Sequence, residues 1–384
     1  MKIAVHFGAG KIGRGFIADL LHDSGYDVIF VDVTQPLIDM INAEHQYNLF
    51  LIDHDYEEKV IDHVKAYSSI TDPNRVIESI SKAEIVTTSV MATNLAKIAP
   101  LLAKGLKARV GQGKKKVVVM ACENAIMGTD ILKKAMIDSG EITLPELNEV
   151  GVYPNTAVDR MVFDGEHHGK KGIEVGDAYE LAIEADKLVD SMDHPIQKAE
   201  YVDNIDKFLK RKIYMVNCGH AVTSYLGFVK GYQTVQEALK DETIVTEMKN
   251  AVMESAAALE KEFGFEHKAL VSYYDNMVIK RYTTPGIADP ITRVAREPIR
   301  KISANDRIMG PAIKCEKYGL NNHYLLKACS CALAYKNPND KQAVELQNFI
   351  AQNGVEQAIE KYIGLLKNDR MTKEIVKMYY TVEK

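Results

Sequence analysis

The stretch 2-KIAVHFGAGKIGRGFIADLL-21 has the pattern of a buried strand, a glycine-rich turn and the start of a helix. The turn contains Gly-x-Gly-x-x-Gly, in which Gly8 permits the tight bend, Gly10 lets backbone approach a pyrophosphate, and Gly13 lets helix and strand pack closely. The N-terminus of the helix offers free N–H groups to the phosphates. The stretch therefore predicts a dinucleotide-binding loop made of Gly8, Ala9, Gly10, Lys11, Ile12 and Gly13.

An acidic residue at the end of the second predicted strand indicates which dinucleotide the loop takes. Asp32 ends the strand signal 26-YDVIFVDV-33, about 20 residues beyond the last glycine of the loop. A carboxylate there can accept hydrogen bonds from both adenosine ribose hydroxyls and would repel a 2′-phosphate. No arginine follows it directly, so the pattern favours NAD over NADP. The alternative is a glycine-rich turn that binds nothing.

Strand and helix signals alternate through the first 120 residues. Near-continuous apolar strands between amphipathic helices indicate a parallel sheet covered on both faces. The segment 48-NLFLIDHD-55 predicts a strand in a hairpin, and residues 146–180 predict added strands joined by a polar turn. Beyond residue 196, helical patterns dominate at 205–225, 231–264, 267–283, 321–335 and 340–367. We therefore expect an α/β Rossmann-type domain, doubly wound with added strands, over residues 1–195, and a mainly α-helical substrate and catalytic domain over residues 196–384.

Composition narrows the class of protein. The 384 residues carry a formal net charge of −5, which gives no bulk attraction for nucleic acid. No uninterrupted apolar run approaches the roughly 18 residues that a membrane span needs, and the start MKIAVHFGAG is not expected to be a signal peptide. The 5 cysteines form no C-x-x-C pair, so neither a disulfide framework nor a zinc knuckle is expected. We expect a cytoplasmic protein with a small-molecule substrate, as a monomer or small homo-oligomer.

The segment 211-RKIYMVNCGHA-221 carries the candidate chemistry. On an α-helix, Lys212, Asn217 and His220 fall at about 0°, 140° and 80°, so all three can face one broad cleft. A lysine removed from water could be neutral and accept the proton of an alcohol, and an amide could stabilise the alkoxide. A metal is not expected, because no Cys/His cluster has ligand spacing. The alternative is an ordinary helix with a long-stemmed lysine, a satisfied asparagine and a surface histidine.

The spacing Lys212-x₄-Asn217-x₂-His220 resembles the catalytic signature of the mannitol dehydrogenase family, the polyol-specific long-chain dehydrogenases. The segments 155-NTAVDRM-161, 281-RYTTPGIADPITRVAREPIRKI-302 and 306-DRIMGPA-312 are similar to further family motifs, so the resemblance covers essentially the whole chain. It implies that Lys212 is the general acid/base and that Asn155 and Asn217 are paired amide donors to the reacting oxygen. It also implies that His220 is a donor that positions the substrate.

The segment 1-MKIAVHFGAGKIGRGFIADLL-21 and the length of the chain give it a close resemblance to one branch of the family, which acts on a phosphorylated polyol. It implies a metal-independent enzyme that interconverts D-mannitol 1-phosphate and D-fructose 6-phosphate with NAD, and Asn124, after the strand signal 115-KKVVVMAC-122, is expected to contact the nicotinamide ribose or carboxamide. Two alternatives stay open. One is a related polyol or uronate oxidoreductase with an unphosphorylated substrate, and the other is a non-catalytic module that senses NAD.

A substrate phosphate would need cationic donors some distance from the reacting carbon. Pro298 is expected to begin a new helix, which would put Arg300 and Lys301 in its first turn, where free N–H groups also favour anions. Arg293 is a third candidate. Each of these residues could equally be structural, so the sequence indicates a region for the phosphate and no defined clamp.

Overall fold

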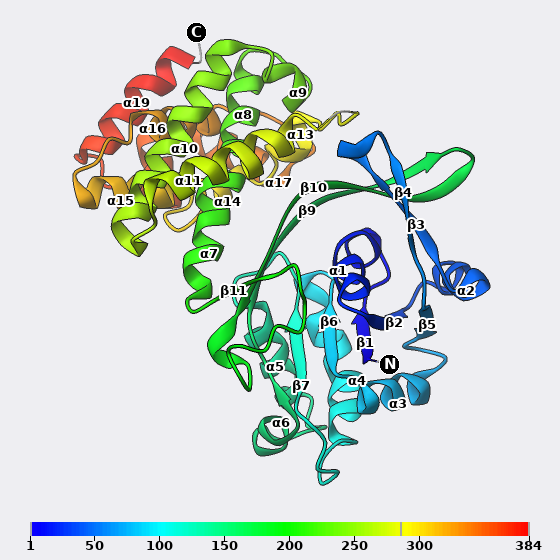
Figure 1. Ribbon diagram of the computed structural model, residues 1–384. Helices are drawn as coiled ribbons and strands as arrows, with labels where there is room; N and C mark the ends of the chain where they lie inside the picture. The colour runs from blue at the N-terminus through cyan, green and yellow to red at the C-terminus, as the bar shows by residue number, and fades with distance from the viewer. Residues whose placement is uncertain (1, 285, 383–384) are drawn as a thin grey trace. The chain divides into compact units, whose positions relative to one another are not determined.

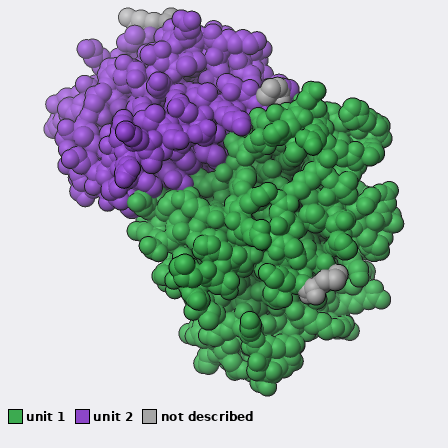
Figure 2. Space-filling view, in the orientation of Figure 1, with its two compact units in different colours: residues 1–208 green, residues 209–384 purple. Residues whose placement is uncertain are grey.

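The computed structural model describes residues 2–284 and 286–382. The chain forms two compact units, unit 1 (Met1–Phe208) and unit 2 (Leu209–Lys384) (Figure 2). The division predicted from the sequence, at 195/196, lies earlier in the chain. Residues 196–208 stay with unit 1, because β11 (Glu200–Val202) pairs in parallel with the end of β10 (Lys170–Glu184). No helix in the described residues is long and apolar enough to cross a membrane.

Unit 1 is built on a six-stranded sheet with the order β5-β2-β1-β6-β7-β8. Every neighbouring pair is parallel, which confirms the predicted doubly wound arrangement. The strand order reverses between β1 and β6, and in such sheets ligands bind beyond the carboxyl ends of the strands at that point. The strands are β1 (Lys2–Phe7), β2 (Tyr26–Asp32), β5 (Val64–Ser68), β6 (Ile85–Thr88), β7 (Val117–Ala121) and β8 (Gly151–Val152).

Both faces of this sheet are covered, because successive side chains of each strand point to opposite faces. Ala4 packs with Phe16 and Leu20 on one face, whereas Val5 and Val119 belong to the core on the other face. The first face carries α1 (Ala18–Asp23) and α2 (Gln35–Glu44), and the second carries α3 (Pro73–Lys82), α4 (Leu95–Lys107), α5 (Gly128–Asp138) and α6 (Leu144–Val150).

A second sheet packs against α1, as Figure 1 shows. The predicted hairpin is β3 (Tyr47–Leu51) with β4 (Glu57–Ile61), and the predicted added strands are β9 (Thr156–His167) and β10, which pair antiparallel. The contact is close at the π-helical segment η1 (Gly13–Ile17), which leads into α1: a Cβ added at Gly15 would lie 2.5 Å from Cγ2 of Ile173 on β10. A side chain at Gly15 would therefore push the helix away from the second sheet.

Unit 2 is helical, as predicted. The predicted helix at 340–367 is broken at Gly354, whose φ of +85° suits glycine and ends the first of two helices. Asp241 precedes the long α10 and caps it, because its side chain accepts from the N–H groups of Thr243 and Ile244. The helices are α7 (Ile205–Arg211), which begins in unit 1, then α8 (Cys218–Val229), α9 (Val235–Ala238), α10 (Glu242–Phe263), α11 (His267–Tyr273), α12 (Lys280–Tyr282), α13 (Ile291–Val294), α14 (Pro298–Lys301), α15 (Met309–Tyr318), α16 (His323–Leu333), α17 (Lys341–Asn353), α18 (Val355–Ile363) and α19 (Arg370–Val382).

Candidate active site

The glycine loop follows β1, and the structural reason for glycine differs among its three glycine positions. A Cβ on Gly8, which has φ +100°, would lie 2.6 Å from the carbonyl oxygen of Ser89, and one on Gly13 would lie 1.9 Å from that of Gly8. The fold itself therefore requires glycine at both positions. A Cβ on Gly10 would meet nothing within 4 Å. Packing does not require glycine there, and the open space beside the backbone fits the close approach of a pyrophosphate.

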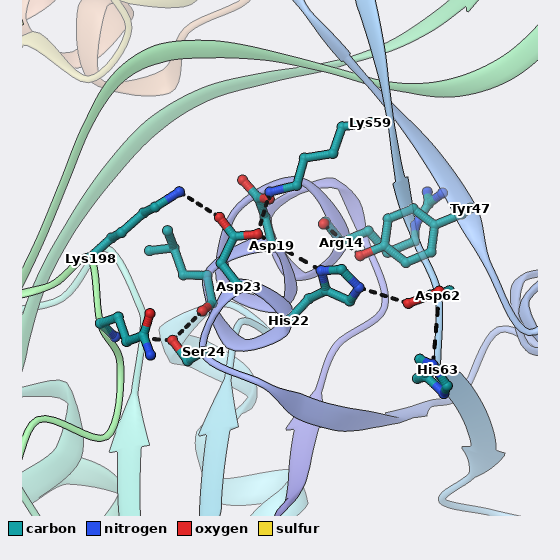
Figure 3. A network of polar contacts seen from close by, with 12 residues as sticks. Arg14, Asp19, His22, Asp23, Ser24, Tyr47, Lys59, Asp62, His63 and Lys198 are labelled. Atoms are coloured by element: carbon teal, nitrogen blue, oxygen red, sulfur yellow. Dashed lines mark hydrogen bonds and ion pairs between the residues drawn. The ribbon is translucent and has the colours of Figure 1, made fainter.

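Hydrogen bonds hold the loop at the start of the following helix. The Arg14 backbone N–H donates to Gly10 O at 3.0 Å, and Arg14 Nε donates to Ala9 O at 2.8 Å. Tyr47 of β3 donates its hydroxyl to Arg14 O at 2.7 Å (Figure 3). Burial raises the pKa of Tyr47 well above its ordinary value, so this hydroxyl keeps its proton. Lys11, by contrast, lies at the surface in an exposed pair with Asp164.

Buried and half-buried charges tie the same helix to the second sheet. Figure 3 shows Lys59 of β4 pointing to the helix, where Lys59 Nζ lies 2.6 Å from Asp19 Oδ1 and 2.6 Å from Asp23 Oδ1. Arg160 of β9 also pairs with Asp19, and it donates to Gly15 O at 3.0 Å. Breaking such a buried pair leaves an uncompensated charge, so the network holds the helix start firmly.

Asp32, the residue expected to select NAD, ends β2 and contacts the glycine loop. Asp32 Oδ2 accepts from Ala9 N at 2.7 Å, and Oδ1 accepts from Val33 N and Thr34 N at 2.8 and 2.9 Å. A carboxylate oxygen has two lone pairs. Oδ2 therefore keeps one acceptor direction for a ribose hydroxyl while it holds the loop.

A buried histidine that was not predicted as a site residue, His6, lies beneath the loop. His6 Nδ1 lies 2.7 Å from Thr87 Oγ1, and His6 Nε2 lies 2.8 Å from Ser89 Oγ. Burial lowers the pKa of His6 to about 3, so the ring is neutral near neutral pH. The signal was visible as the one polar residue within the run 3-IAVHF-7, just before the glycines.

A buried carboxylate organises the neighbouring strand ends. Glu123 Oε1, after β7, accepts from Thr88 Oγ1 at 2.7 Å and from Val90 N at 2.8 Å. This links the ends of β6 and β7, and the next residue along the chain is the exposed Asn124. Asn124 thus lies on the loop beyond the carboxyl end of β7, at the sheet edge where the glycine loop also lies.

Three candidate catalytic residues, Lys212, Asn217 and His220, belong to unit 2. The segment η5 (Lys212–Asn217) is a π-helical turn and not the α-helix that the sequence analysis expected. In a π-helix, hydrogen bonds join residues five apart, so Lys212 and Asn217 lie about one turn apart on the same side. Lys212 is only 6% exposed. The half-buried Asn217 amide has no hydrogen-bond partner among the described residues.

His220 lies in the first turn of α8 and is held on two sides. Its Nε2 is 3.1 Å from Asp289 Oδ2, and its ring stacks on Tyr282 with 4.8 Å between centroids. The hydroxyl of Tyr282 donates to the carbonyl of Val216. Burial lowers the pKa of His220 despite the nearby carboxylate. Asp289 was not identified from the sequence, because nothing local to it marks a partner for His220.

The fourth candidate, Asn155, belongs to unit 1 and is 2% exposed. Asn155 Oδ1 accepts from Thr129 N and Asp130 N at 3.1 and 3.3 Å, at the start of α5. Its Nδ2 donates to Asp130 Oδ2 at 3.1 Å and to Glu184 Oε2 at 3.2 Å. Both amide hydrogens thus have acceptors within unit 1. Donation to a substrate oxygen would require one of these carboxylates to release its hydrogen.

The phosphate candidates are all engaged by protein groups. Pro298 begins α14 as predicted, but this helix has only 4 residues. Lys301 is 4% exposed and donates to the carbonyls of Val294 and Arg296, and burial lowers its pKa to about 7. Arg300 Nη2 donates to Glu297 Oε2 at 2.7 Å. Lys301 is therefore placed to support the backbone.

Arg293 is the most exposed of these cations. Its side chain is 57% exposed and makes a two-point contact with Asp289. It borders a surface hollow of about 850 Å³, together with the cations Arg296 and Lys341 and the anions Glu297 and Asp340.

Within residues 2–284 and 286–382, no group of three or more His, Cys, Asp or Glu side chains could hold a metal ion. The 5 cysteines are buried free thiols.

Comparison with known proteins gives matches over almost the whole chain. Two family models match, the mannitol dehydrogenase Rossmann domain over residues 2–194 and the mannitol dehydrogenase C-terminal domain over residues 204–383. The mannitol-1-phosphate 5-dehydrogenase of Geobacillus stearothermophilus is 39% identical over 95% of this chain and 96% of its own length. That of Oceanobacillus iheyensis is 38% identical, over 98% and 97%.

Two solved structures share the fold. D-sorbitol dehydrogenase in a substrate-free form superposes with a TM-score of 0.84 at 17% identity, covering 99% of this chain and 93% of that one. Pseudomonas fluorescens mannitol 2-dehydrogenase, in a ternary complex with NAD and D-mannitol, gives a TM-score of 0.74 at 18% identity, covering 100% and 92%. At these identities the likeness supports the fold, a Rossmann-type domain followed by a helical domain.

Proposed function

This chain belongs to the mannitol dehydrogenase family, and from that premise we propose that it interconverts D-mannitol 1-phosphate and D-fructose 6-phosphate with NAD. The family match and the relatives make the chain a polyol dehydrogenase, an oxidoreductase. One observation carries the proposed substrate: relatives aligned over 95% or more of this chain, at 36–39% identity, are named mannitol-1-phosphate 5-dehydrogenase. The partner is then a small sugar-alcohol phosphate.

NAD fits the residues at the carboxyl edge of the main sheet. The open space beside Gly10 and the remaining acceptor direction of Asp32 Oδ2 support binding of the pyrophosphate and the adenosine ribose. The exposed Asn124 is proposed to contact the nicotinamide half. When bound, NAD takes up a hydride from the carbinol carbon, or NADH returns it to the ketone.

Lys212 is the proposed general acid/base. Lys212 is buried, and in its neutral form the amine takes the hydroxyl proton during oxidation. In the reverse direction the ammonium form gives that proton to the ketone oxygen. Asn217, on the same side of the π-helical turn and with no hydrogen-bond partner for its amide within residues 2–284 and 286–382, is the proposed donor to the oxygen as charge develops on it. These groups supply the proton transfer and the oxyanion contact without a metal.

The remaining two site residues have narrower proposed roles. Asn155 would join Asn217 as an oxyanion donor only if Asp130 or Glu184 releases one amide hydrogen, so its contribution is proposed as secondary. His220 is proposed to position the substrate. For the phosphate, the exposed side chains of Arg293 and Arg300 are the proposed contacts, and Lys301 holds the backbone that carries them.

The deciding experiment follows NADH oxidation spectrophotometrically with fructose 6-phosphate, and with fructose and fructuronate as controls. We expect turnover with fructose 6-phosphate that exceeds the controls by orders of magnitude and survives a metal chelator. Equal or higher activity on fructose or fructuronate would favour an oxidoreductase with an unphosphorylated substrate. NADH binding with no turnover on any of the three would favour the sensing module and contradict the proposal.

A further inference from the structure

The contacts of His220 determine which of its ring nitrogens carries the hydrogen. Its Nε2 lies 3.1 Å from Asp289 Oδ2. An ionised carboxylate can only accept hydrogen bonds, so Nε2 must donate. Burial lowers the pKa of His220, which favours the neutral ring with a single N–H. With that hydrogen on Nε2, the Nδ1 atom carries a lone pair and can only accept.

Asp289 is itself held in the ionised form. Arg293 Nε donates to Asp289 Oδ1 at 2.5 Å, and Arg293 Nη2 donates to Oδ2. Burial raises the pKa of Asp289, but the hydrogen bonds from His220 and Arg293 outweigh it and lower that pKa to about 2. The Arg293 cation also offsets the negative charge that would otherwise draw a second proton onto His220, which explains how a buried histidine beside a carboxylate stays neutral.

The backbone around Asp289 fixes the carboxylate in place. Its N–H donates to Gln236 Oε1 at 2.7 Å, and its carbonyl accepts from Val235 N at 3.0 Å, so the segment is tied to α9. On the other side, the ring of Tyr282 stacks on the imidazole of His220 at an angle of 21°. The imidazole is thus fixed at one face and at one nitrogen. Its Nδ1 has no hydrogen-bond partner among the described residues.

We propose that Asp289 is a positioning residue that holds His220 as the Nε2–H tautomer, so that His220 Nδ1 accepts a hydrogen bond from a substrate hydroxyl. This rests on the proposed function, and it reverses the donor role that the family resemblance implied for His220. Each hydroxyl of a polyol carries a hydrogen to donate, whereas a keto or deoxy carbon does not. A fixed acceptor therefore selects a hydroxyl at one position, since an analogue without it would leave Nδ1 without a partner.

The tautomer can be measured without turnover, on the full chain with ¹⁵N-labelled histidine. Two-bond ¹H–¹⁵N correlation spectra distinguish Nε2–H, Nδ1–H and imidazolium forms, and the His220→Asn variant identifies the resonances of His220. We expect the neutral Nε2–H form at pH 7 in the wild type and a mixture of tautomers in Asp289→Asn. An Nδ1–H or imidazolium ring in the wild type overturns the proposal, even if Asp289→Asn fails to fold.

Kinetics then test whether the tautomer matters to the substrate. In Asp289→Asn we expect kcat/KM for fructose 6-phosphate to fall about 10–100-fold, the usual effect of weakening a hydrogen bond to a charged group, with an unchanged Kd for NADH. The matched control is Asp241→Asn, which alters a helix-capping aspartate elsewhere in unit 2 and should stay near wild type. Equal losses in both variants, or no loss in Asp289→Asn, would reduce Asp289 to a structural residue.

Failure of the proposed function and failure of the tautomer assignment give different combinations of kinetic and NMR results. If the wild type turns over none of the three carbonyl substrates but shows the Nε2–H form, the substrate assignment fails and the tautomer assignment stands. If fructose 6-phosphate is turned over and the tautomer is Nδ1–H, the reverse holds.

Discussion

Lys212 and Asn217 are the first and last residues of one π-helical turn, so they lie on the same side of the helix. Lys212 is the proposed proton acceptor at a carbinol oxygen, and Asn217 is the proposed amide donor to that oxygen. In a regular α-helix these residues would point about 140° apart. π-helical turns occur frequently at functional sites.

Replacing Lys212 tests the proton transfer. We expect Lys212→Ala to lower kcat by about 10²–10⁴-fold, the usual contribution of general acid/base catalysis, while NADH binding by unit 1 is retained. The measurements are steady-state rates and a fluorescence titration with NADH. Lys210→Ala is the matched control, because Lys210 lies two positions earlier, over the ring of Tyr214. An unchanged rate in Lys212→Ala would exclude Lys212 as the base.

Replacing Asp32 tests the choice of cofactor. Asp32→Ala removes the carboxylate that would repel a 2′-phosphate, so the ratio of kcat/KM for NADP to that for NAD should rise at least tenfold. Affinity for NAD should fall as well, because Ala9 N loses its acceptor. Asp39→Ala, on the exposed side of α2, is the control. If NADP is still rejected as strongly as in the wild type, another group selects the cofactor.

Substitutions at two glycines of the loop separate its effect on NADH binding from its effect on the stability of unit 1. Gly10→Ala should leave the free energy of unfolding within about 0.5 kcal/mol of wild type, because the added Cβ meets nothing, yet weaken NADH binding at least tenfold. Gly13→Ala should instead destabilise unit 1 by at least about 1–3 kcal/mol, because its Cβ would lie 1.9 Å from Gly8 O. Denaturant unfolding and NADH titration measure the two effects. Native NADH affinity in Gly10→Ala would remove the loop as a pyrophosphate site.

Replacing Asn155 tests whether its side chain has a structural or a catalytic role. Asn155→Ala leaves the backbone N–H groups of Thr129 and Asp130 without their buried side-chain acceptor, so we expect the free energy of unfolding to fall by about 1–3 kcal/mol. Denaturant unfolding of the wild type and the variant gives this difference. A variant as stable as wild type but with kcat reduced a hundredfold would show that the amide serves the substrate instead.

His6 makes the stability of unit 1 depend on pH. Its pKa in the folded protein is about 3, below the unfolded value of 6.5, so the unfolded chain binds the proton first as the pH falls. The stabilising contribution of the neutral ring is complete above pH 6.5. As the pH falls from 6.5 to 3, the free energy of unfolding decreases by about 1.4 kcal/mol per pH unit. The wild type should therefore lose its advantage over His6→Gln across this window in urea unfolding. The exposed His267→Gln is the control, and a constant advantage at all pH values would contradict this account.

The sequence by itself was enough for the features that neighbouring residues determine. The order strand, Gly8–Gly13 loop and helix, the acid at Asp32 and the change from β-branched runs to helical periodicity depend only on local residues, and these features predicted the fold correctly. Pro298 was likewise recognisable as a helix start, since its ring restricts its own backbone.

The tertiary structure alone decided which side chains meet. Asp289 reaches His220 because the segment that carries it is tied to α9, and Asn155 is enclosed by carboxylates from α5 and β10. The burial of Lys301 beneath two carbonyls has the same origin. Contacts between residues far apart along the chain produce no periodic pattern in the sequence. They depend on how whole helices and strands pack and not on the residues adjacent in sequence.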